Sequence, residues 1–562
     1  IGMNLSRAYT LSERYKGNKV TLPIGRVKTP TLALVVRRER ELADFKPVDY
    51  FTVKILYTHE NGTFWATWQP KDEQKGLDPD GRLINKGVAE SLVQQLASSP
   101  DGVVKSVTKS KKKDLQRLPL SLSSLQVLAG KAYSYDPQTV LDTAQKLYEK
   151  KLTTYPRSDC EYLPPNQYGD RMAILSNLAQ SGDEKLSQWA QNADRNIKSR
   201  AWNEKKITAH HAIIPTAEFA KQGFTGLAES ECKLMNLVCS KLLCAVAAPH
   251  EYETVTAVFS CAGNEFTAKG KTVLVPGWKE IDQRFRSTLK ADTEEEVLNT
   301  LPELAEGQSF SVTANVSEHF TSPPKAYTED TLLSAMERAG TEDMPEDKVN
   351  CSAGAREGGL GHAERKGLGT PATRAAILEK LVQMGFVQRK GKQLVPTKDG
   401  INLAVVLPES LTSPVLTAEW ENRLTEIAKG NADADEFMAE IEAQVRQLVK
   451  TYSCISADKQ NLFQSERVII GKCPRCNENV YEGKKNFYCG NRSCQFVMWK
   501  NDRFFEQRKK AFTPKIAAAL LKDGKAKVKG LYSEKTGKIY DATVLLADTG
   551  GKYVNYRVER KG

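Results

Sequence analysis

A phenol and a guanidinium stand two residues apart in the stretch TTYPRSDC, residues 153–160. The ordinary pKa of a tyrosine phenol is about 10, so Tyr155 is a poor nucleophile at neutral pH unless its anion is stabilised. The Arg157 guanidinium could stabilise that anion and also hold a phosphate oxygen with its planar donors. These residue types fit nucleophilic attack on a phosphate. A core tyrosine beside a surface cation is the alternative, and the stretch by itself leaves both open.

Four cysteines form the second pattern with clear chemistry. Cys473 and Cys476 have the spacing C-x2-C, and after twelve intervening residues Cys489 and Cys494 follow with the spacing C-x4-C. Two such thiolate pairs supply the four ligands of a tetrahedral Zn²⁺ ion and leave no coordination position for catalysis. The pattern therefore predicts a structural zinc ribbon.

Lysines and aromatic rings lie within and just after the cysteine pattern. Lys484 and Lys485 supply positive charge, and Phe487, Tyr488 and Trp499 supply flat rings. Such rings can stack on the unpaired bases of single-stranded DNA while lysines follow the phosphates. Small zinc modules also use aromatic residues as core, and this interpretation stays open.

The positive charge is concentrated at the C-terminal end. The 562-residue chain carries a net charge of +12, and residues 471–562 hold 21 Lys and Arg against nine Asp and Glu, which accounts for the whole excess. A basic tail on a nearly neutral body predicts a nucleic-acid partner. A solubilising lysine-rich end is the alternative.

Neither a membrane nor a secreted location is indicated. No apolar run approaches the roughly 18 residues of a membrane span, and the first ten residues lack the apolar segment of a signal peptide. Eleven cysteines in so long a chain do not indicate a disulfide framework. We predict a cytoplasmic protein with no membrane partner.

The elements that must position these residues alternate between strands and helices. Residues 51–70 read as two strands around the turn ENGT, and residues 253–277 read as a second β stretch. Between them, residues 120–133 and 136–151 have helical spacing, and Asp136-Pro137 is a good N-cap followed by Pro at the first helical position. We therefore predict that the helical region is inserted between two halves of one β domain. A second helical region is predicted over 328–450.

Several motifs in a fixed order resemble one family. AQKLYEKKLTTYPRSDC (144–160) resembles the active-site segment of type IA DNA topoisomerases, and its YPRSD form is that of the bacterial topoisomerase III branch. The other motifs similar to that family are GRVKTPTLALVVRRERE (25–41), LPLSLSSLQ (118–126), TAHHAIIPT (208–216), PPKAYTEDTLLSAMERAG (323–340), the segment 366–400 and LTAEWENRLTEIAKG (416–430). The zinc segment and the basic tail also fit this resemblance.

The resemblance implies a role for each matching residue. Tyr155 would attack the DNA backbone and form a 5′-phosphotyrosine, Arg157 would hold the scissile phosphate, and His210 would contact DNA. The neighbouring His211 is expected to be structural.

Further DNA contacts are implied at Arg26 in GRVKTP, at Thr373 and Arg374 in GTPATR, and at the lysines 484 and 485. Thr373 could instead be the N-cap of a helix, and Arg26 could be a solvated cation.

The implied fold is multidomain α+β, with a helical gate domain inserted in a β-arch domain. The expected domains are a helical DNA-binding domain in two segments (1–50 and 323–460), a β-arch domain in two halves (51–115 and 246–322), a helical gate domain carrying the tyrosine (116–245), a zinc ribbon (461–500) and a small basic C-terminal topoisomerase repeat module (501–562). In that last module, alternating lysines 525, 527 and 529 fit a phosphate track or simply an exposed strand.

The implied function is cleavage, passage and resealing of one DNA strand without ATP, on single-stranded DNA and on negatively supercoiled or catenated duplex, by a monomer. The sequence itself also supports a reaction without ATP. The GKT sequence at 270–272 resembles the end of a phosphate-binding loop, but Glu265 stands where that loop needs its first glycine. A tyrosine relaxase would need a histidine triad around a metal, and the only close histidines are His210 and His211.

The family also uses Mg²⁺, held by acidic residues of an N-terminal Toprim domain. The segment IGMNLSRAYT at residues 1–10 resembles the stretch just after Toprim, so we expect the chain to be a fragment that lacks this acidic site. Asp433, Asp435 and Glu436 have D-x-D spacing, but no strand precedes them, and we interpret them as a solvated helix face. A Toprim-less chain that serves only as a single-stranded DNA-binding scaffold is therefore the alternative function.

Overall fold

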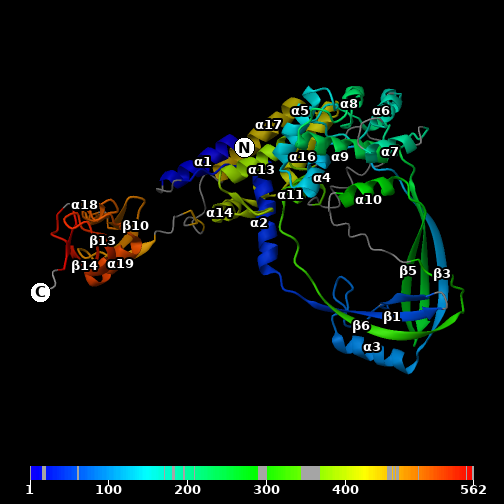
Figure 1. Cartoon of the computed structure of the whole chain (residues 1–562), viewed down its shortest axis with the longest axis horizontal. Helices are drawn as coiled ribbons and strands as arrows, with labels where there is room; N and C mark the ends of the chain where they lie inside the picture. The colour runs from blue at the N-terminus through cyan, green and yellow to red at the C-terminus, as the bar shows by residue number, and fades with distance from the viewer. Residues whose placement is uncertain are drawn as a thin grey trace. The chain divides into compact units, whose positions relative to one another are not determined.

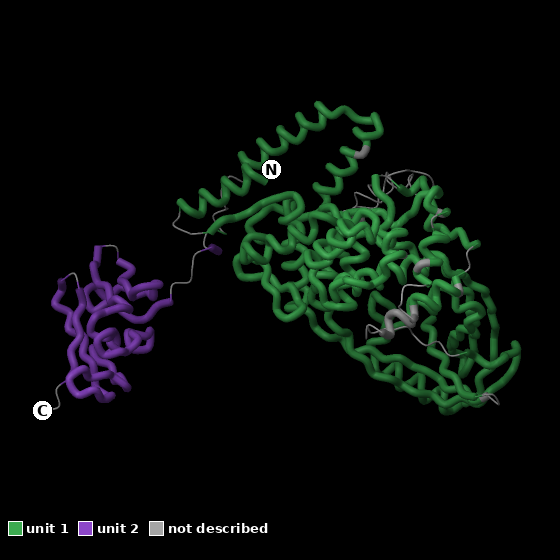
Figure 2. Tube along the Cα trace, turned by 45° about the horizontal axis from the view of Figure 1, so that its top comes forward, with its two compact units in different colours: residues 1–460 green, residues 461–562 purple. Residues whose placement is uncertain are grey.

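The computed structural model describes most of the chain in two compact units, residues 1–460 and 461–562 (Figure 2). The described residues are 2–15, 20–59, 62–71, 73–169, 171–179, 184–193, 196–207, 209–288, 300–342, 367–451, 459, 462–463, 468–491, 493–551 and 553–559. Within these ranges, no helix combines the length and the apolar character that crossing a bilayer requires.

Six strands of the first unit close into a barrel in the order β1-β2-β5-β4-β3-β6. Their bounds are β1 (Asp49–His59), β2 (Gly62–Gln69), β3 (Asp101–Asp114), β4 (His250–Cys261), β5 (Asn264–Val275) and β6 (Ser309–Phe320). Ile55 and Tyr57 are buried in the barrel core together with Leu92 of helix α3 (Lys86–Ser98). Strands from both sides of the helical insertion build this one barrel, as the sequence predicts. The hairpin predicted around ENGT is also confirmed, with His59 paired to Gly62, and the residues between these two lie outside the described ranges.

Beyond the barrel, β3, β4 and β5 continue as a three-stranded ribbon toward the helices (Figure 1). Residues 106–114 of β3 pair with residues 250–258 of β4, and β4 pairs with β5 as far as Val275. The GKT sequence lies inside β5, so it is part of a strand and not a phosphate-binding loop.

The end of this ribbon is fastened to helix α10 (Trp278–Thr288). The Asp114 carboxylate lies 2.7 Å from Lys279 Nζ, and the Asp114 carbonyl accepts a hydrogen bond from Trp278 Nε1 at 3.1 Å. Gly277 has a φ of +55°, and a Cβ there would lie 2.3 Å from the Pro249 carbonyl oxygen, so the turn requires glycine. These contacts join the strand ends to α10, which packs against the last helix of the insertion, α9 (Glu229–Val246).

The helical insertion has one continuous hydrophobic core. Its helices are α4 (Leu122–Tyr133), α5 (Pro137–Glu149), α6 (Arg171–Leu178), α7 (Glu184–Asn192), α8 (Ala217–Gln222) and α9 (Glu229–Val246). α5 begins as predicted, because the Asp136 carboxylate accepts the Thr139 N–H at 2.9 Å and Pro137 occupies the first turn. The buried face of α9 contributes Leu234, Leu237 and Val238 to the core.

A second set of helices completes the first unit. They are α1 (Gly2–Tyr15), α2 (Lys28–Asp44), α11 (Glu329–Glu342), α13 (Pro371–Gln383), α14 (Lys398–Val406), α15 (Glu409–Thr412), α16 (Val415–Ala428) and α17 (Ala434–Thr451), with the hairpin β7 (Val387–Lys390) and β8 (Gln393–Pro396) between α13 and α14. Helices α11 and α13 pack against α4 of the insertion. We call this interface between the insertion and the second helical set the gate interface.

The second unit combines two small sheets around one core. The four-stranded sheet has the order β12-β11-β10-β9, and the three-stranded sheet has the order β13-β14-β15. Its elements are β9 (Ile469–Lys472), β10 (Asn479–Glu482), β11 (Asn486–Cys489), β12 (Val497–Trp499), α18 (Arg503–Gln507), α19 (Pro514–Asp523), β13 (Lys525–Tyr532), β14 (Ile539–Ala547) and β15 (Asn555–Val558). The helix followed by strands predicted for 513–559 is confirmed. Phe487 and Phe496 from the cysteine segment share the core with Phe512 and Val544, so the predicted ribbon and the predicted terminal module form one unit.

Candidate active-site tyrosine and zinc centre

The loop that carries Tyr155 begins where α5 is forced to end. Lys151 has a φ of +63°, the Leu152 N–H bonds to the Leu147 carbonyl, and the Lys151 N–H bonds to the Tyr148 carbonyl. This pairing is a Schellman motif, which satisfies the last helical carbonyls and turns the chain away from the helix. Pro156 then prevents a new helix, because a residue before proline is restricted to extended conformations. Tyr155 is thus presented on extended chain.

Three of the sequence motifs converge on this loop through backbone hydrogen bonds. The Thr154 N–H bonds to the Ile214 carbonyl at 3.0 Å, and the Ile213 N–H bonds to the Leu120 carbonyl at 2.7 Å. On the far side of the tyrosine, the Leu122 N–H bonds to the Ser158 carbonyl at 2.7 Å. Segments that are distant in sequence therefore form one small platform under Tyr155.

The phenol ring lies between two other rings. The centroids of Tyr155 and His210 are 4.3 Å apart with the planes tilted by 36°, and Tyr148 meets Tyr155 edge-on at 5.7 Å. Tyr155 is half-buried and His210 is exposed. Arg157, two residues on, is exposed and forms no ion pair with any residue that the structure describes. The His210 and Arg157 side chains are therefore open to solvent, and the Tyr155 side chain is partly open to it.

The neighbouring His211 has a different environment. Its Nε2 lies 2.9 Å from Gln167 Nε2, and its Nδ1 lies 2.9 Å from the Ala212 carbonyl oxygen. The Gln167 amide nitrogen can donate to His211 Nε2, and His211 Nδ1 can donate to the Ala212 carbonyl. Both ring nitrogens are thus used inside the protein, which fits the structural role expected for His211.

Arg374 lies inside the gate interface. It is 3% exposed, and it donates from Nη1 to Ser123 Oγ at 2.7 Å and from Nε to the Leu368 carbonyl at 3.2 Å. Its Nη1 is also 3.8 Å from the Glu337 carboxylate. Burial lowers the pKa of Arg374, while Glu337 and Asp159 of the tyrosine loop oppose that shift. In this conformation the guanidinium joins α13 to α4, and its implied DNA contact stays a prediction.

Thr373 and Arg26 also have partners inside the protein. The Thr373 hydroxyl accepts the Thr370 N–H at 3.0 Å and completes a capping box at the start of α13, while its side chain remains exposed. Arg26 Nη1 lies 2.6 Å from the Glu421 carboxylate, so it joins two of the matching motifs. The N-cap of α13 is Thr370 and not Thr373, which lies at the third helical position of the capping box. The ion pair with Glu421 shows that Arg26 is not simply solvated.

A cavity of about 570 Å³, the gate cavity, lies between α4 and α11. Its lining includes Glu161, Glu337, Arg117, Lys131 and Arg200. Burial raises the pKa of the Glu161 carboxyl, and the nearby Glu337 carboxylate raises it further, against hydrogen bonds from Ser124 and Ser121. Glu161 lies one residue beyond TTYPRSDC, so the tyrosine loop leads directly into this interface.

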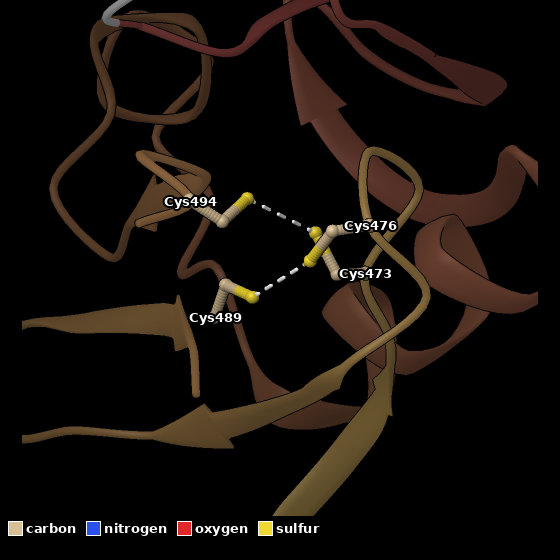
Figure 3. A group of neighbouring side chains, drawn as sticks. All are labelled: Cys473, Cys476, Cys489 and Cys494. Carbon is tan, nitrogen blue, oxygen red and sulfur yellow. Dashed lines mark hydrogen bonds between the residues drawn. The ribbon is translucent and has the colours of Figure 1, made fainter. Parts of the chain in front are cut away.

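The four predicted zinc ligands meet in the second unit (Figure 3). The sulfur atoms of Cys473 and Cys494 are 3.7 Å apart, those of Cys476 and Cys489 are 3.4 Å apart, and all four lie within 4.8 Å of one another. Zinc–sulfur bonds of about 2.3 Å in a tetrahedron place sulfurs about 3.8 Å apart. The four sulfurs are therefore spaced close to what a tetrahedral Zn²⁺ ion requires.

The sequence of the chain is similar to that of a known protein family over most of its length. A profile described as DNA topoisomerase matches residues 1–439. The chain belongs to this family. The DNA topoisomerase 3 of Vibrio cholerae is 37% identical over 456 residues, which are 80% of this chain and 67% of that protein. The DNA topoisomerase 3 of Bacillus licheniformis is 34% identical over 506 residues, which are 88% of this chain and 64% of that protein. The chain thus spans about two thirds of the length of these relatives.

The fold of the topoisomerase-family chain has a counterpart among solved structures. Full-length topoisomerase I from Thermotoga maritima superposes with a TM-score of 0.53 at 20% identity, over 88% of this chain and 75% of that one. The family and the type IA fold expected from the motifs are therefore confirmed, as is the mixed α+β class.

The acidic residues considered in the sequence do not form a metal site. Asp433 accepts the Glu436 N–H at 2.8 Å at the start of α17, and Asp435 is exposed. Among the described residues, the four cysteines are the only cluster of three or more His, Cys, Asp or Glu that could hold a metal ion. In the part of the chain that the structure describes, no cluster of acidic residues could therefore bind the predicted Mg²⁺.

The lysines next to the zinc centre are exposed, as a DNA contact requires. Lys484 and Lys485 lie in the turn between β10 and β11, and Trp499 is 39% exposed. Phe487, by contrast, is fully buried and belongs to the core. Arg475, between the first two cysteines, pairs with both oxygens of Asp548 at 2.6 and 2.7 Å and so fastens the zinc knuckle to the terminal sheet.

Three residues of the site escaped the sequence analysis. Tyr148 lies edge-on to the tyrosine, Thr154 bonds the tyrosine loop to the histidine segment, and Ser123 receives Arg374. All three lie within segments that resemble the family, Tyr148 and Thr154 within 144–160 and Ser123 within 118–126, but only Tyr148 is of a residue type that suggests contact with another ring. The other two are ordinary hydroxyl residues whose partners are fixed by tertiary packing.

Proposed function

We propose that this chain performs the strand-cleaving chemistry of a topoisomerase III. It would transiently cut one DNA strand through a 5′-phosphotyrosine, pass another strand and reseal the first without ATP, and so relax negative supercoils and separate catenated circles. The observation that carries the proposal is the half-buried Tyr155 ring beside the exposed His210, with the exposed Arg157 in the same loop.

The proposed step balances without any co-reactant. The Tyr155 hydroxyl oxygen attacks the phosphorus, a new oxygen–phosphorus bond forms, and the bond from phosphorus to the 3′ oxygen breaks. The phenol loses its proton, and the 3′ oxygen gains one and leaves as a hydroxyl. One phosphodiester replaces another, so the bond energy is retained for resealing. Arg157 would grip the phosphate oxygens, and His210 would contact the DNA beside the phenol.

Strand passage needs the gate interface to open. Opening would separate Ser123 on α4 from Arg374 on α13, which are joined by a buried hydrogen bond of 2.7 Å. The three-stranded ribbon, fastened to α10 through Asp114, would carry the insertion away from the second helical set. Domain movements of this kind occur in microseconds to milliseconds.

One observation favours the second candidate function, a single-stranded DNA-binding scaffold. The described residues offer no carboxylate cluster for Mg²⁺, while the exposed Lys484 and Lys485 offer contacts for phosphates. Such a scaffold would bind single strands in the same way and form no covalent bond.

Transfer of a DNA label to the protein tests the two candidates. The full chain is incubated with Mg²⁺ and a single-stranded oligonucleotide labelled at its 3′ end, with and without a separately supplied Toprim domain. The downstream fragment stays on a 5′-phosphotyrosine, so a 3′ label should move to the protein and a 5′ label should not. Tyr155→Phe should bind the oligonucleotide with unchanged affinity and acquire no label.

Labelling of the Tyr155→Phe variant, or transfer of the 5′ label, would exclude Tyr155 as the proposed nucleophile. Absence of transfer both with and without Toprim, with binding intact, would favour the scaffold.

A further inference from the structure

The tyrosine loop is fixed at both ends by hydroxyl side chains. Thr154 Oγ1 donates to the Ala212 carbonyl at 2.9 Å and accepts the Ile214 N–H at 3.0 Å. On the other side, Ser158 Oγ accepts the Cys160 N–H at 3.1 Å, and Ser158 itself is fully buried. Between these two anchors, Tyr155 and Arg157 face the solvent-accessible side. The Thr154 side chain therefore connects the chain at Tyr155 to the segment that carries His210.

We propose that Thr154 is a positioning residue that holds the Tyr155 ring against His210. Thr154 precedes the phenol directly, and the carbonyl to which it donates lies two residues after the imidazole. Together with the backbone bond from the Thr154 N–H to the Ile214 carbonyl, the hydroxyl makes three contacts between the two segments. This inference rests on the proposed function, because the position matters only if Tyr155 is the nucleophile.

The chemistry of the position explains why threonine serves there. The hydroxyl must donate to one partner and accept from another at the same time, which valine cannot do. The branched Cβ restricts χ1, so the hydroxyl is held in the orientation that both partners need. Serine keeps both hydrogen bonds and loses only part of that restriction.

The neighbouring threonines provide matched controls. Thr153 Oγ1 is buried and has no hydrogen-bond partner within the described structure, so Thr153→Val changes the adjacent residue without breaking a bond. Thr216 joins the same two chain segments farther from the tyrosine, since its hydroxyl donates to the Lys151 carbonyl at 2.5 Å and accepts the Phe219 N–H. Thr216→Val therefore removes comparable bonds without touching the phenol.

The first readout is the rate of covalent adduct formation by the full chain with separately supplied Toprim. Thr154→Val is expected to form adduct about 100-fold more slowly, because a misplacement of about 1 Å can cost that much. Its affinity for the oligonucleotide should be unchanged, and Thr154→Ser should restore most of the rate. In a His210→Ala background, Thr154→Val should lower the rate of adduct formation much less, because the contact between Tyr155 and His210 that Thr154 supports is already gone.

The second readout does not need activity. Histidine labelled with ¹³C at Cε1 gives signals from six residues, and the His210→Gln variant identifies the one that belongs to His210. The Tyr155 ring should displace that signal, and Tyr155→Leu supplies its position without the ring. Thr154→Val should move the signal toward the Tyr155→Leu position, while Thr154→Ser, Thr153→Val and Thr216→Val should leave it in place.

An unchanged His210 signal in Thr154→Val would overturn the inference, whether or not any adduct forms. Equal losses of rate in Thr154→Val and Thr216→Val would also overturn it, because the effect would then be general destabilisation. Failure of the wild-type chain to form adduct, with the signal behaving as expected, would count against the proposed function while leaving the Thr154 contact established.

Discussion

The rings of Tyr155 and His210 lie 4.3 Å apart, although each belongs to a different motif of the chain. The segment of Tyr155 is joined to the segment of His210 by the backbone hydrogen bond from the Thr154 N–H to the Ile214 carbonyl. Tyr155, the proposed nucleophile, therefore lies beside His210 while its side chain stays half-buried. The adjacent His211, by contrast, is bonded at both ring nitrogens within the protein.

The two histidines should therefore respond differently to substitution. His210→Ala should lower the rate of adduct formation by about 100-fold, the lower end of what a positioned side chain contributes, and leave stability within about 0.5 kcal/mol. His211→Ala should destabilise the first unit by about 1 kcal/mol through its lost hydrogen bonds. Denaturant unfolding and adduct assays on both variants check this. A reversed pattern would place the functional histidine at 211.

The buried hydrogen bond between Arg374 and Ser123 should stabilise the closed gate interface. Ser123→Ala leaves one donor of a buried guanidinium without a partner, so it should cost about 1–3 kcal/mol of the closed state. Single-molecule fluorescence between α4 and α13 should then show a larger open fraction, about tenfold for each 1.4 kcal/mol. Ser98→Ala, at an exposed helix end, is the control and should change nothing measurable. An unaltered open fraction would show that this bond does not hold the gate.

Exposed and buried cations should differ in their contribution to DNA affinity. Replacing Lys484 and Lys485 by glutamine should flatten the slope of log affinity against log salt by up to about 1.4 for single-stranded DNA. Arg374→Met should leave that slope unchanged, because the guanidinium is buried in this conformation. Lys86→Gln, on the barrel helix α3, serves as the exposed control. Titrations at several salt concentrations check all three, and a flatter slope for Arg374→Met would restore its implied DNA contact.

Removal of zinc should loosen the whole second unit and spare the first. The cysteine sulfurs are arranged for one tetrahedral ion, and metal binding at such sites contributes directly to folding. Since Phe487 and Phe512 share one core and Arg475 pairs with Asp548, the terminal sheet should be destabilised as well. Calorimetry with and without a chelator should show one shifted transition and one constant transition. A zinc content below one ion per chain after refolding with the metal would contradict the assignment.

The Glu161 carboxyl should make stability depend on pH in a defined direction. Burial in the gate interface raises its pKa above the ordinary value of 4.5, so between that value and the raised pKa the folded state binds more protons than the unfolded state. This contribution is present below the ordinary value and is lost as the pH rises through the raised pKa. Glu161→Gln should therefore gain stability relative to wild type as the pH increases, and the exposed Glu204→Gln should not. Parallel unfolding curves for wild type and Glu161→Gln across this range would argue against a raised pKa.

Local chemistry was readable from the sequence. Cys473, Cys476, Cys489 and Cys494 were identified because zinc accepts few ligand spacings, and the start of α5 at Asp136-Pro137 was identified because capping acts over three residues. The split barrel was also predictable, since alternating strand patterns appear on both sides of the helical insertion. Family resemblance then supplied Tyr155, Arg157 and His210.

The tertiary structure decided which of these residues meet and which are enclosed. Nothing in the spacing of Tyr155 and His210 requires their rings to touch, because the contact depends on hydrogen bonds between segments brought together by the core of the insertion. The burial of Arg374 could not be predicted from the sequence either. An arginine in a helical motif gives the same sequence pattern whether its side chain contacts DNA or a serine on another helix. Sequence patterns record interactions within a few residues of one another, and contacts between distant segments exist only once the chain has packed.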